Sequence, residues 1–299
     1  MCRLSIIFIM SALVSLASCV KRDFSADKLQ NELNEYVKDK DCRIGIAVIY
    51  KEDTVQVRGN ENFPMLSVYK FPQAIAVSRI CEARGLAPGD SINIKGEELL
   101  PDTHSPMRDR YGESDIKLPV GELLGYTLMV SDNNACDILF RLIGGTAAAD
   151  SVIKSLGYGD ITIANTEEEM NDDPRLCQQN CATPLALAGL MNDFYNTGND
   201  NEWIRTVKLY LESCETGATR IPGGNFDGET LIGHKTGTGP RDESGRIIAV
   251  NDVGYIEFSS GESYVLAVMI AQSTENLEDT ECMIGEISEI VRRNIEGLR

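Results

Sequence analysis

The chain has 299 residues, of which 42% are hydrophobic and 25% charged, a composition typical of a globular protein with a sizeable core. Lys and Arg number 28 against 46 Asp and Glu, which gives a formal net charge of −18. Nucleic acid and anionic membrane surfaces repel so acidic a chain, and we expect neither as a partner. The overall charge says little about a small substrate, because the local charge of a cleft can have the opposite sign.

The first 19 residues are typical of an export signal. Arg3 gives a positive start, and residues 4–16 form an apolar stretch that is too short to span a bilayer comfortably. Residues 16–19, Leu-Ala-Ser-Cys, resemble a bacterial lipobox, in which the cysteine becomes the lipidated first residue of the mature chain. We therefore expect an exported, periplasmic lipoprotein anchored at Cys19. The alternative is an ordinary signal peptide whose cysteine is incidental.

Seven cysteines remain after Cys2 and Cys19: Cys42, Cys81, Cys136, Cys177, Cys181, Cys214 and Cys282. An odd number leaves at least one unpaired within the chain, and the spacing does not reveal a pairing. Cys177 and Cys181 lie four residues apart, but no His or second Cys pair flanks them at metal-ligand spacing. We expect no metal site, no cofactor, and nothing that requires more than a monomer.

Beyond the leader, hydrophobic spacing predicts a helix over residues 26–37 and then a hairpin of strands 44–50 and 54–58. From Ser67 to about Leu156 the pattern is mostly helical, with glycines as stops. The remaining predicted elements are helices 185–196 and 202–212, strands 231–236, 247–258 and 263–270, and a closing helix 278–295.

Strands at both ends of the chain and a helical middle predict an α+β fold. We expect an antiparallel sheet flanked by helices and formed from both chain ends, plus an inserted all-helical lobe. The α/β lobe would comprise residues 20–62 and 215–299, and the helical lobe residues 63–214. Because clefts form where two lobes meet, the active site is expected at their interface.

Ser67-Val68-Tyr69-Lys70 places a hydroxyl and an amine three residues apart, on one face of a helix that we expect to begin at about Ser67. Pro72 would then fall in the second turn and remove one backbone bond. Apolar neighbours imply burial, which favours a neutral Lys70 able to activate the serine. The same S-x-x-K spacing occurs three more times in the chain, so the pair alone is not specific.

Two further motifs single out this pair. Ser131-Asp132-Asn133 follows an apolar helical run, and Lys235-Thr236-Gly237 lies on a predicted strand near the C-terminus. S-x-x-K, S-D-N and K-T-G in this order form the signature of the penicilloyl serine transferases. The sequence resembles that superfamily, and the class A serine β-lactamases in particular, from about Asp41 to the C-terminus.

The class A resemblance rests on a fourth element. Glu167-Glu168-Glu169-Met170-Asn171 is similar to the family's E-x-x-L-N loop, with Met170 in place of leucine. Without the other motifs, the segment would be interpreted as an acidic surface loop. The resemblance implies that Glu167 is the base of deacylation and that Glu167 and Asn171 position the water that cleaves the acyl-enzyme.

The resemblance also implies the other roles. Ser67 is the nucleophile, the backbone amides of Ser67 and Thr238 form the oxyanion hole, and Ser131 passes a proton to the departing lactam nitrogen. Lys70 or Glu167 accepts the proton of Ser67, and the residues do not decide between them. The substrate carboxylate would be held by Lys235, Thr236 and Thr238, and the amide side chain of the drug by Asn133.

Three positions depart from the family pattern. Val250 stands where many members place an arginine that binds the substrate carboxylate, and Arg220 resembles the position from which some relatives supply that guanidinium. Arg241 and Arg246 are the rival candidates. An Arg–Asp pair that clasps the glutamate loop in many relatives is replaced by Asn165 and Asn180, so the loop is expected to be held differently or to be more open.

The altered loop and the Ser67–Phe71 segment resemble the cephalosporinase, extended-spectrum branch of class A. We expect hydrolysis of β-lactam antibiotics, hence resistance, with cephalosporins preferred over penicillins. His104 resembles an aromatic position at the site entrance, where it would stack on substrate; a plain surface histidine is the alternative.

Rival functions share the fold. A D-Ala-D-Ala peptidase of cell-wall synthesis would release a bound β-lactam slowly, and a β-lactam sensor would stay acylated. The Glu167 loop favours hydrolysis over both. With only His104 and His234 in the chain, a Ser-His-Asp hydrolase or a His-rich zinc hydrolase is not supported.

Overall fold

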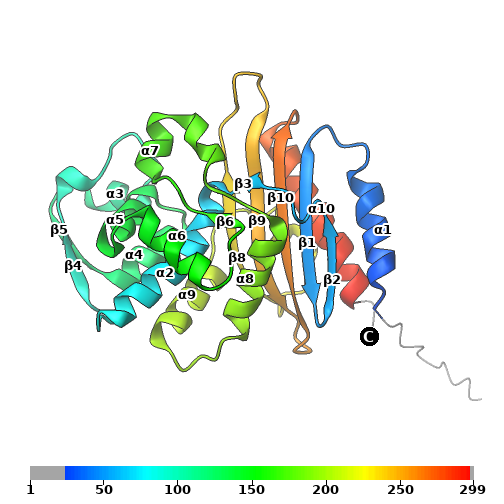
Figure 1. Cartoon of the computed structure of the whole chain (residues 1–299), viewed down its shortest axis with the longest axis horizontal. Helices are drawn as coiled ribbons and strands as arrows, with labels where there is room; N and C mark the ends of the chain where they lie inside the picture. The colour runs from blue at the N-terminus through cyan, green and yellow to red at the C-terminus, as the bar shows by residue number, and fades with distance from the viewer. Residues whose placement is uncertain (1–23, 297–299) are drawn as a thin grey trace, which may run out of the picture.

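The computed structural model describes residues 24–296 and centres on a five-stranded antiparallel sheet (Figure 1). Both chain ends build this sheet, in the order β2-β1-β10-β9-β8. Its strands are β1 (Arg43–Tyr50), β2 (Asp53–Val57), β8 (Leu231–Thr238), β9 (Ile247–Glu257) and β10 (Ser263–Ser273). The two ends meet where β1 pairs with β10, with Ala47 opposite Ala267. Strand β8 lies at the edge and faces the helical part of the molecule.

Successive side chains of a strand point to opposite faces of the sheet, so the buried side chains form two hydrophobic cores. On β1, Ile44, Ile46 and Val48 join one core, while Ala47 joins the other. The first core lies under α1 (Ala26–Val37) and α10 (Leu277–Glu296), which pack on each other and on one face of the sheet. The second core lies under α8 (Pro184–Asn196) and continues into the helical part. Both faces of the sheet are thus buried, which explains why its central strands are mostly apolar.

The segment between β2 and β8 supplies the remaining helices. They are α2 (Lys70–Ala83), α3 (Pro106–Tyr111), α4 (Val120–Met129), α5 (Asn133–Ile143), α6 (Thr146–Ser155), α7 (Glu167–Asp172), α8 and α9 (Glu202–Glu212). Helix α2 is buried on nearly all sides, and its second half packs between α5, α6 and α9. This burial makes α2 a rigid base for the residues at its N-terminus.

Two small sheets in this segment were not predicted. Strands β4 (Ser91–Ile94) and β5 (Ile116–Pro119) form one of them. The other joins β3 (Phe63–Pro64), β7 (Cys181–Ala182) and β6 (Ile161–Thr162). Strands of two to four residues are too short to show a period in the sequence, so the expectation of a purely helical insert omitted them.

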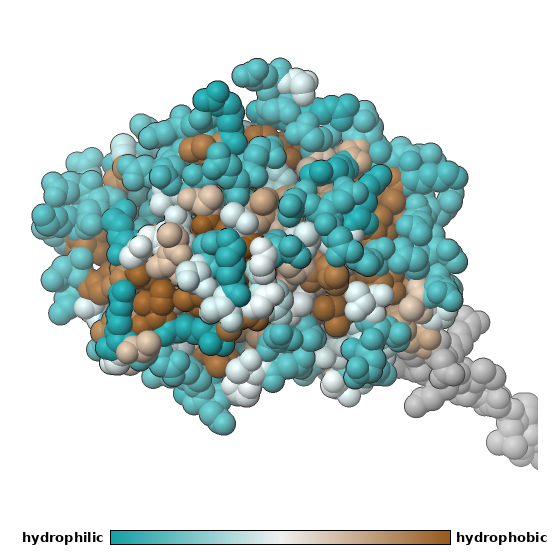
Figure 2. Space-filling model, viewed as in Figure 1, coloured by the Kyte–Doolittle hydropathy of each residue, from teal (hydrophilic) through white to brown (hydrophobic). Residues whose placement is uncertain are grey.

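The fold class predicted from the sequence is confirmed, because the structure combines the expected antiparallel sheet with flanking helices. The predicted leader and the cysteine expected to carry lipid lie outside the described residues. Within residues 24–296, no helix is both long and apolar enough to cross a membrane. Hydrophilic side chains cover most of the face drawn in Figure 2, as expected for a chain with a net charge of −18.

Candidate active site

Ser67 lies in a 3-10 turn, η1 (Leu66–Tyr69), and Lys70 begins the α-helix that follows. The helix therefore starts three residues later than predicted. Pro72 falls in its first turn, where amides have no partner within the helix, so the proline costs no backbone bond. Lys70 Nζ lies 3.2 Å from Ser67 Oγ, which confirms that the spacing of the pair brings hydroxyl and amine together.

The backbone before Ser67 is strained and firmly held. Leu66 has a φ of 47°, in the left-handed region that non-glycine residues rarely adopt. Asn251 Nδ2 on β9 donates to the carbonyls of Pro64 and Met65, at 2.8 and 3.0 Å. The amide of Met65 donates to the carbonyl of Asn180 at 2.8 Å. Strain that is overdetermined in this way is typical of functional sites.

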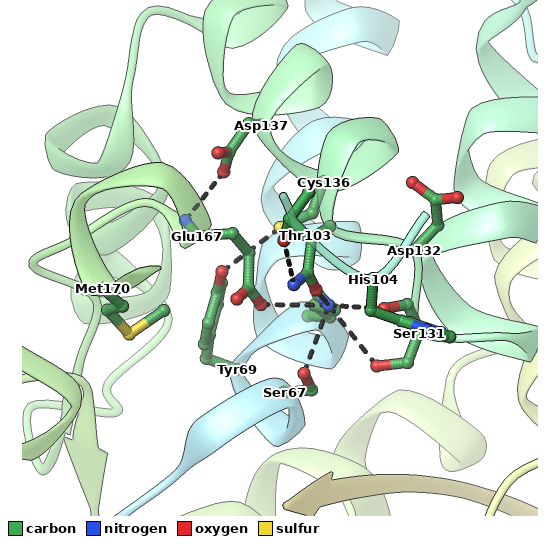
Figure 3. Close-up of polar contacts among 12 residues, drawn as sticks. Ser67, Tyr69, Thr103, His104, Ser131, Asp132, Cys136, Asp137, Glu167 and Met170 are labelled. Atoms are coloured by element: carbon green, nitrogen blue, oxygen red, sulfur yellow. Dashed lines mark hydrogen bonds and ion pairs between the residues drawn. The ribbon is translucent and has the colours of Figure 1, made fainter. Parts of the chain in front are cut away.

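Lys70 is fully buried, and its side-chain nitrogen is the centre of the site. It lies 2.6 Å from Asn133 Oδ1, 2.8 Å from the carbonyl of Ser131 and 2.9 Å from Glu167 Oε1. Ser131 Oγ is 3.4 Å away. Figure 3 shows the side chains of Ser67, Ser131 and Glu167 directed toward this point from three different segments of the chain. A single amine can therefore exchange protons with the serine and with the carboxylate.

Ser131 sits in the short connection between α4 and α5, with a φ of 58°. Asp132 is the N-cap of α5: its buried carboxylate accepts from the amide of Ala135 at 2.8 Å, as expected for an aspartate in this place. The same carboxylate accepts from Ser105 Oγ and from the amide of Met107. Asp132 thus fixes the turn that points Ser131 into the cleft.

Glu167 is the first residue of α7, which Thr166 and Glu169 close with a capping box. The backbone amides of Glu167 and Glu168 donate to the two oxygens of Asp137, at 2.9 and 2.8 Å. Burial and the charge of Glu167 together raise the pKa of Asp137 to about 7, although these two amides and the charge of Lys70 act to lower it. Whereas Glu168 is exposed, the side chain of Glu167 points inward to Lys70.

The loop before α7 is held by the side-chain amides of Asn165 and Asn180, which form no ion pair. Asn180 Oδ1 accepts from the amides of Ala164 and Asn165, both at 2.8 Å, and its Nδ2 donates to the carbonyl of Asn165 at 2.9 Å. Asn165 Nδ2 in turn donates to the carbonyl of Leu176 at 3.3 Å. The sequence left two alternatives for this loop, a different set of bonds or a more open conformation. The structure shows the different set of bonds.

Lys235, Thr236 and Thr238 lie on β8, on the opposite side of the cleft from Glu167. Lys235 is fully buried, and its Nζ lies 3.1 Å from Ser131 Oγ. Burial, helped by the charges of Lys70 and Arg220 and opposed by those of Cys214 and Asp252, lowers the pKa of Lys235 to about 8. Ser131 Oγ therefore has a lysine nitrogen on each side, one from Lys70 and one from Lys235.

Strand β8 also presents the expected oxyanion amide. The amide of Gly239 donates to the carbonyl of Ala249 on β9, and successive residues of an antiparallel strand turn their amides to opposite sides. The amide of Thr238 therefore points away from β9, toward η1. A Cβ on Gly237 would lie only 2.4 Å from the carbonyl oxygen of Met65, so β8 and η1 pack closely against each other.

The three candidate arginines lie at different positions relative to the cleft. Arg220 Nη2 lies 2.6 Å from Thr238 Oγ1 and 2.7 Å from Glu281, while Nη1 bonds the carbonyls of Gly237 and Asn251. Arg241 bonds backbone carbonyls of the β8–β9 turn and of residue 275, and Arg246 pairs with Asp41. Only Arg220 of the three borders the cleft.

These groups surround an open cleft of about 740 Å³. Of the predicted residues, the following line it: Ser67, Ser131, Asn133, Glu167, Asn171, Arg220, Thr236 and Thr238. Lys70 and Lys235 lie beneath its floor. His104 is exposed at the edge of the cleft, where its Nε2 bonds the carbonyl of Val130. Within residues 24–296, no cluster of His, Cys, Asp or Glu could hold a metal ion.

Sequence reasoning missed several partners of these residues. Thr103 Oγ1 accepts from Asn133 Nδ2 at 2.8 Å, Thr216 Oγ1 bonds Thr236 Oγ1 at 2.5 Å, and Glu281 pairs with Arg220. None belongs to a motif, and each reaches the site from a separate element. Thr216 alone had a signal, because it lies four residues before Arg220 in the sequence.

Comparisons with known proteins agree with this geometry. The model of the β-lactamase enzyme family matches residues 26–295. A β-lactamase of Phocaeicola vulgatus is 37% identical over 267 residues, which cover 88% of this chain and 83% of that protein. The crystal structure of a class A β-lactamase from Bacteroides cellulosilyticus has a TM-score of 0.87 at 31% identity, covering 92% of this chain and 100% of that one. The TLA-1 extended-spectrum β-lactamase has a TM-score of 0.86 at 33% identity, covering 90% and 99%.

A buried lysine shared by two serines and a carboxylate, in a cleft between a sheet and a helical segment, defines the class of protein as a serine enzyme. The chain belongs to the β-lactamase enzyme family, as a class A serine β-lactamase.

Proposed function

We propose that this enzyme opens β-lactam rings through an acyl-enzyme on Ser67 and that a water directed by Glu167 then frees the serine. One observation carries the proposal: Lys70 Nζ lies within 3.4 Å of Ser67 Oγ, Ser131 Oγ and Glu167 Oε1. Proton exchange between these groups needs hydrogen-bond distances, and here each pair with Lys70 has one.

The reaction follows from this arrangement. Ser67 Oγ attacks the lactam carbonyl while its proton passes to Lys70 or, through it, to Glu167, and the amides of Ser67 and Thr238 stabilise the oxyanion. The C–N bond breaks, and the ring nitrogen receives a proton from Ser131, which Lys70 and Lys235 flank. Water activated by Glu167 and positioned with Asn171 then hydrolyses the ester and regenerates Ser67.

Lys235, Thr236, Thr238 and Arg220 would hold the carboxylate of the substrate. Arg220 bonds Thr238 Oγ1 and Lys235 bonds the carbonyl of Thr236, so two cationic side chains adjoin these hydroxyl groups, which supports binding of an anion by an acidic protein. Asn133, fixed between Lys70 and Thr103, would bind the amide side chain of the drug.

We further propose that cephalosporins are hydrolysed more efficiently than penicillins. Support comes from the neutral Asn165–Asn180 loop and from the similarity to the TLA-1 extended-spectrum enzyme. Purified residues 20–299 should turn over many equivalents of a chromogenic cephalosporin, with a kcat/KM above that for benzylpenicillin. A single stoichiometric burst would instead support a sensor or a D-Ala-D-Ala peptidase, and a reversed ratio would contradict the preference.

The activity should also decrease at alkaline pH. Lys235 is a cation below its pKa of about 8 and neutral above it, so its attraction for a carboxylate is lost as the pH rises through this value. We expect kcat/KM for a carboxylate-bearing cephalosporin to decline above about pH 8, whereas an esterified analogue should show a weaker decline. The check is a kcat/KM profile from pH 6 to 9.5, which reports the free enzyme. Equal profiles for acid and ester would contradict this role of Lys235.

For the exported form, we propose a monomeric periplasmic lipoprotein anchored at Cys19. The leader sequence supports the export, and residues 16–19 support the lipid. Mass spectrometry of the mature N-terminus tests it: a diacylglyceryl-modified Cys19 is expected, and an unmodified N-terminus would contradict the anchor. Gel filtration of residues 20–299 tests the monomer.

A further inference from the structure

A second cavity lies in the helical part of the molecule, apart from the active-site cleft. Its volume is about 370 Å³, which is within the usual range of small-ligand sites. It opens beside the second half of α2 and is lined from α2, α8 and α9, with α6 close by (Figure 1). No residue that lines it also lines the active-site cleft.

Apolar and aromatic side chains form the inner wall of this second cavity. Leu190, Phe194 and Trp203 border it and are at most 8% exposed. Trp203 Nε1 donates to the carbonyl of Leu86 at 3.1 Å, so the indole nitrogen is satisfied and the ring is fixed in place. Tyr158 adds a third aromatic ring. Walls of this kind bind the apolar body of a ligand, and their rings also attract a cationic group.

Two exposed carboxylates mark the mouth of the cavity. Glu82 Oε1 accepts from Asn201 Nδ2, and Asp193 Oδ2 accepts from the hydroxyl of Tyr158, both at 2.5 Å. Both donors are neutral, and within residues 24–296 neither carboxylate forms an ion pair. Arg79 is the single cation among the lining residues. Two carboxylates against one guanidinium leave the lining with an excess of negative charge.

The nearest buried lysine does not neutralise this charge. Lys208 Nζ lies 5.9 Å from the centre of the Phe194 ring, but Lys208 does not line the cavity. Its ammonium donates to the carbonyls of Tyr195 and Thr197 and to Asn199 Oδ1, each at 2.9 Å. An ammonium group has three donors, so all of them are used in these bonds.

We propose that the second cavity binds a small organic cation, namely a protonated amine on an aromatic or short aliphatic body. The apolar wall takes the body, and the ammonium group lies at the mouth with Glu82 and Asp193. An anion of the same shape meets two carboxylates and one guanidinium, and a neutral analogue lacks the attraction of charge. The proposal does not rest on the proposed function, because the cavity shares no residue with the cleft.

Occupation of the cavity should also stabilise the fold. A ligand there contacts α2, α8 and α9 at once. Phe194 in addition packs edge-on against Phe71, the residue after Lys70, with ring centres 5.6 Å apart. A ligand that binds only the native state raises Tm, and at about ten times its Kd we expect a rise of roughly 3–5 °C.

Three probes that differ in one group test the proposal on residues 20–299 at pH 7. They are 4-phenylbutylamine, the uncharged 4-phenylbutan-1-ol and the anion 4-phenylbutanoate. Calorimetry should give the amine a Kd of roughly 0.1–1 mM, as expected for so small a ligand, and the alcohol a Kd about tenfold higher. Trp203 is the chain's single tryptophan, so its fluorescence should change with the same midpoint.

Two results with these probes would overturn the proposal. Equal Kd values for amine and alcohol, or tighter binding of the carboxylate, would show that the cavity does not select a cation. Neither heat nor a fluorescence change with any of the three would show that it is not a binding site.

A double variant tests the role of the two carboxylates. Glu82→Gln with Asp193→Asn removes both charges but leaves an oxygen to accept from Asn201 and Tyr158. The Kd of the amine should rise about tenfold, to that of the alcohol, while the Kd of the alcohol stays within about twofold. Glu289→Gln is the control, because Glu289 is an exposed glutamate of α10 outside the cavity. An amine Kd that is unchanged in the double variant would overturn the selection of a cation.

A further variant locates the bound probe. Ser78 is buried and lines the cavity, and its hydroxyl bonds only the carbonyl of Ala74, one turn earlier in α2. Ser78→Leu therefore fills part of the cavity without leaving a side-chain partner unpaired, and the Kd of every probe should rise more than about tenfold. A folded Ser78→Leu protein that binds the amine with the parent Kd would overturn the site. If this variant does not fold, the Trp203 titration and the double variant still decide.

Discussion

Replacing Glu167 by alanine is expected to give an enzyme that β-lactams acylate and that then fails to release the product. The carboxylate of Glu167 is the group placed to activate water, while Lys70 keeps its bonds to Ser67, Ser131 and Asn133 without it. Loss of a general base typically lowers a rate about 10²- to 10⁴-fold, and here the loss should fall on deacylation. Intact-protein mass spectrometry after mixing with a cephalosporin should show the covalent adduct persisting for minutes to hours.

Glu168→Ala provides the matched control. Glu168 is the next residue of the same helix and an equally charged one, but its side chain is exposed. Only its backbone amide contacts Asp137, and the substitution leaves that amide in place. Its turnover should therefore stay close to that of the parent enzyme. Turnover by Glu167→Ala within tenfold of the parent would rule out Glu167 as the deacylating base.

The same variant separates the two bases that the sequence left open. If Lys70 alone takes the proton of Ser67, the burst of acylation in Glu167→Ala should be as fast as in the parent. If Glu167 takes it through Lys70, the burst should slow as well, because the path over the 2.9 Å contact is lost. Stopped-flow measurement of the burst distinguishes these results.

The grouping of the candidate site residues could be predicted because the motifs that carry them are residue types in a fixed order along the chain. Ser67 and Lys70 are neighbours in one turn, and Ser131 and Lys235 belong to motifs on separate elements whose side chains meet at 3.1 Å. The sheet was predictable for a different reason. Long apolar strands at both chain ends, such as β9 and β10, have to be buried on two faces.

What could not be predicted depends on contacts across the fold. Nothing in the sequence links Asn133 to Thr103 or Arg220 to Glu281, because separate elements bring these residues together. The ion pair of His234 with Asp252 could likewise be seen only once β8 and β9 were paired. The start of α2 at Lys70 could not be predicted either. The strained backbone of Leu66 depends on the hydrogen bonds that Asn251 and Asn180 make with the backbone just before it.

The loop of Glu167 shows how a neutral pair can replace an ion pair. An asparagine side chain both donates and accepts, whereas a carboxylate only accepts. Asn180 uses this difference: its oxygen takes two backbone amides and its nitrogen bonds the carbonyl of Asn165. Each group is satisfied without burying a charge, so the loop avoids the desolvation cost that a buried ion pair carries.

Asn180→Leu should therefore destabilise the protein strongly. Leucine has a similar size but no polar atoms, so the amides of Ala164 and Asn165 and the carbonyl of Asn165 lose their partner at a fully buried position. Leaving such groups unpaired costs roughly 1–3 kcal/mol each when they are buried, and partial access of water at Ala164 reduces the sum to about 2–4 kcal/mol. Thermal unfolding should show Tm lowered by roughly 5–10 °C.

Gln178→Leu removes an amide from the same loop at an exposed position and should change Tm by less than about 2 °C. The two variants also differ in what they do to catalysis. Asn180 fixes the loop that carries Glu167, and its backbone carbonyl holds Met65 beside the nucleophile. Asn180→Leu should therefore slow deacylation well below its own melting temperature, with the acyl-enzyme visible by mass. An Asn180→Leu protein that melts like Gln178→Leu would mean that the amide network contributes little, and that packing around Met170 holds the loop instead.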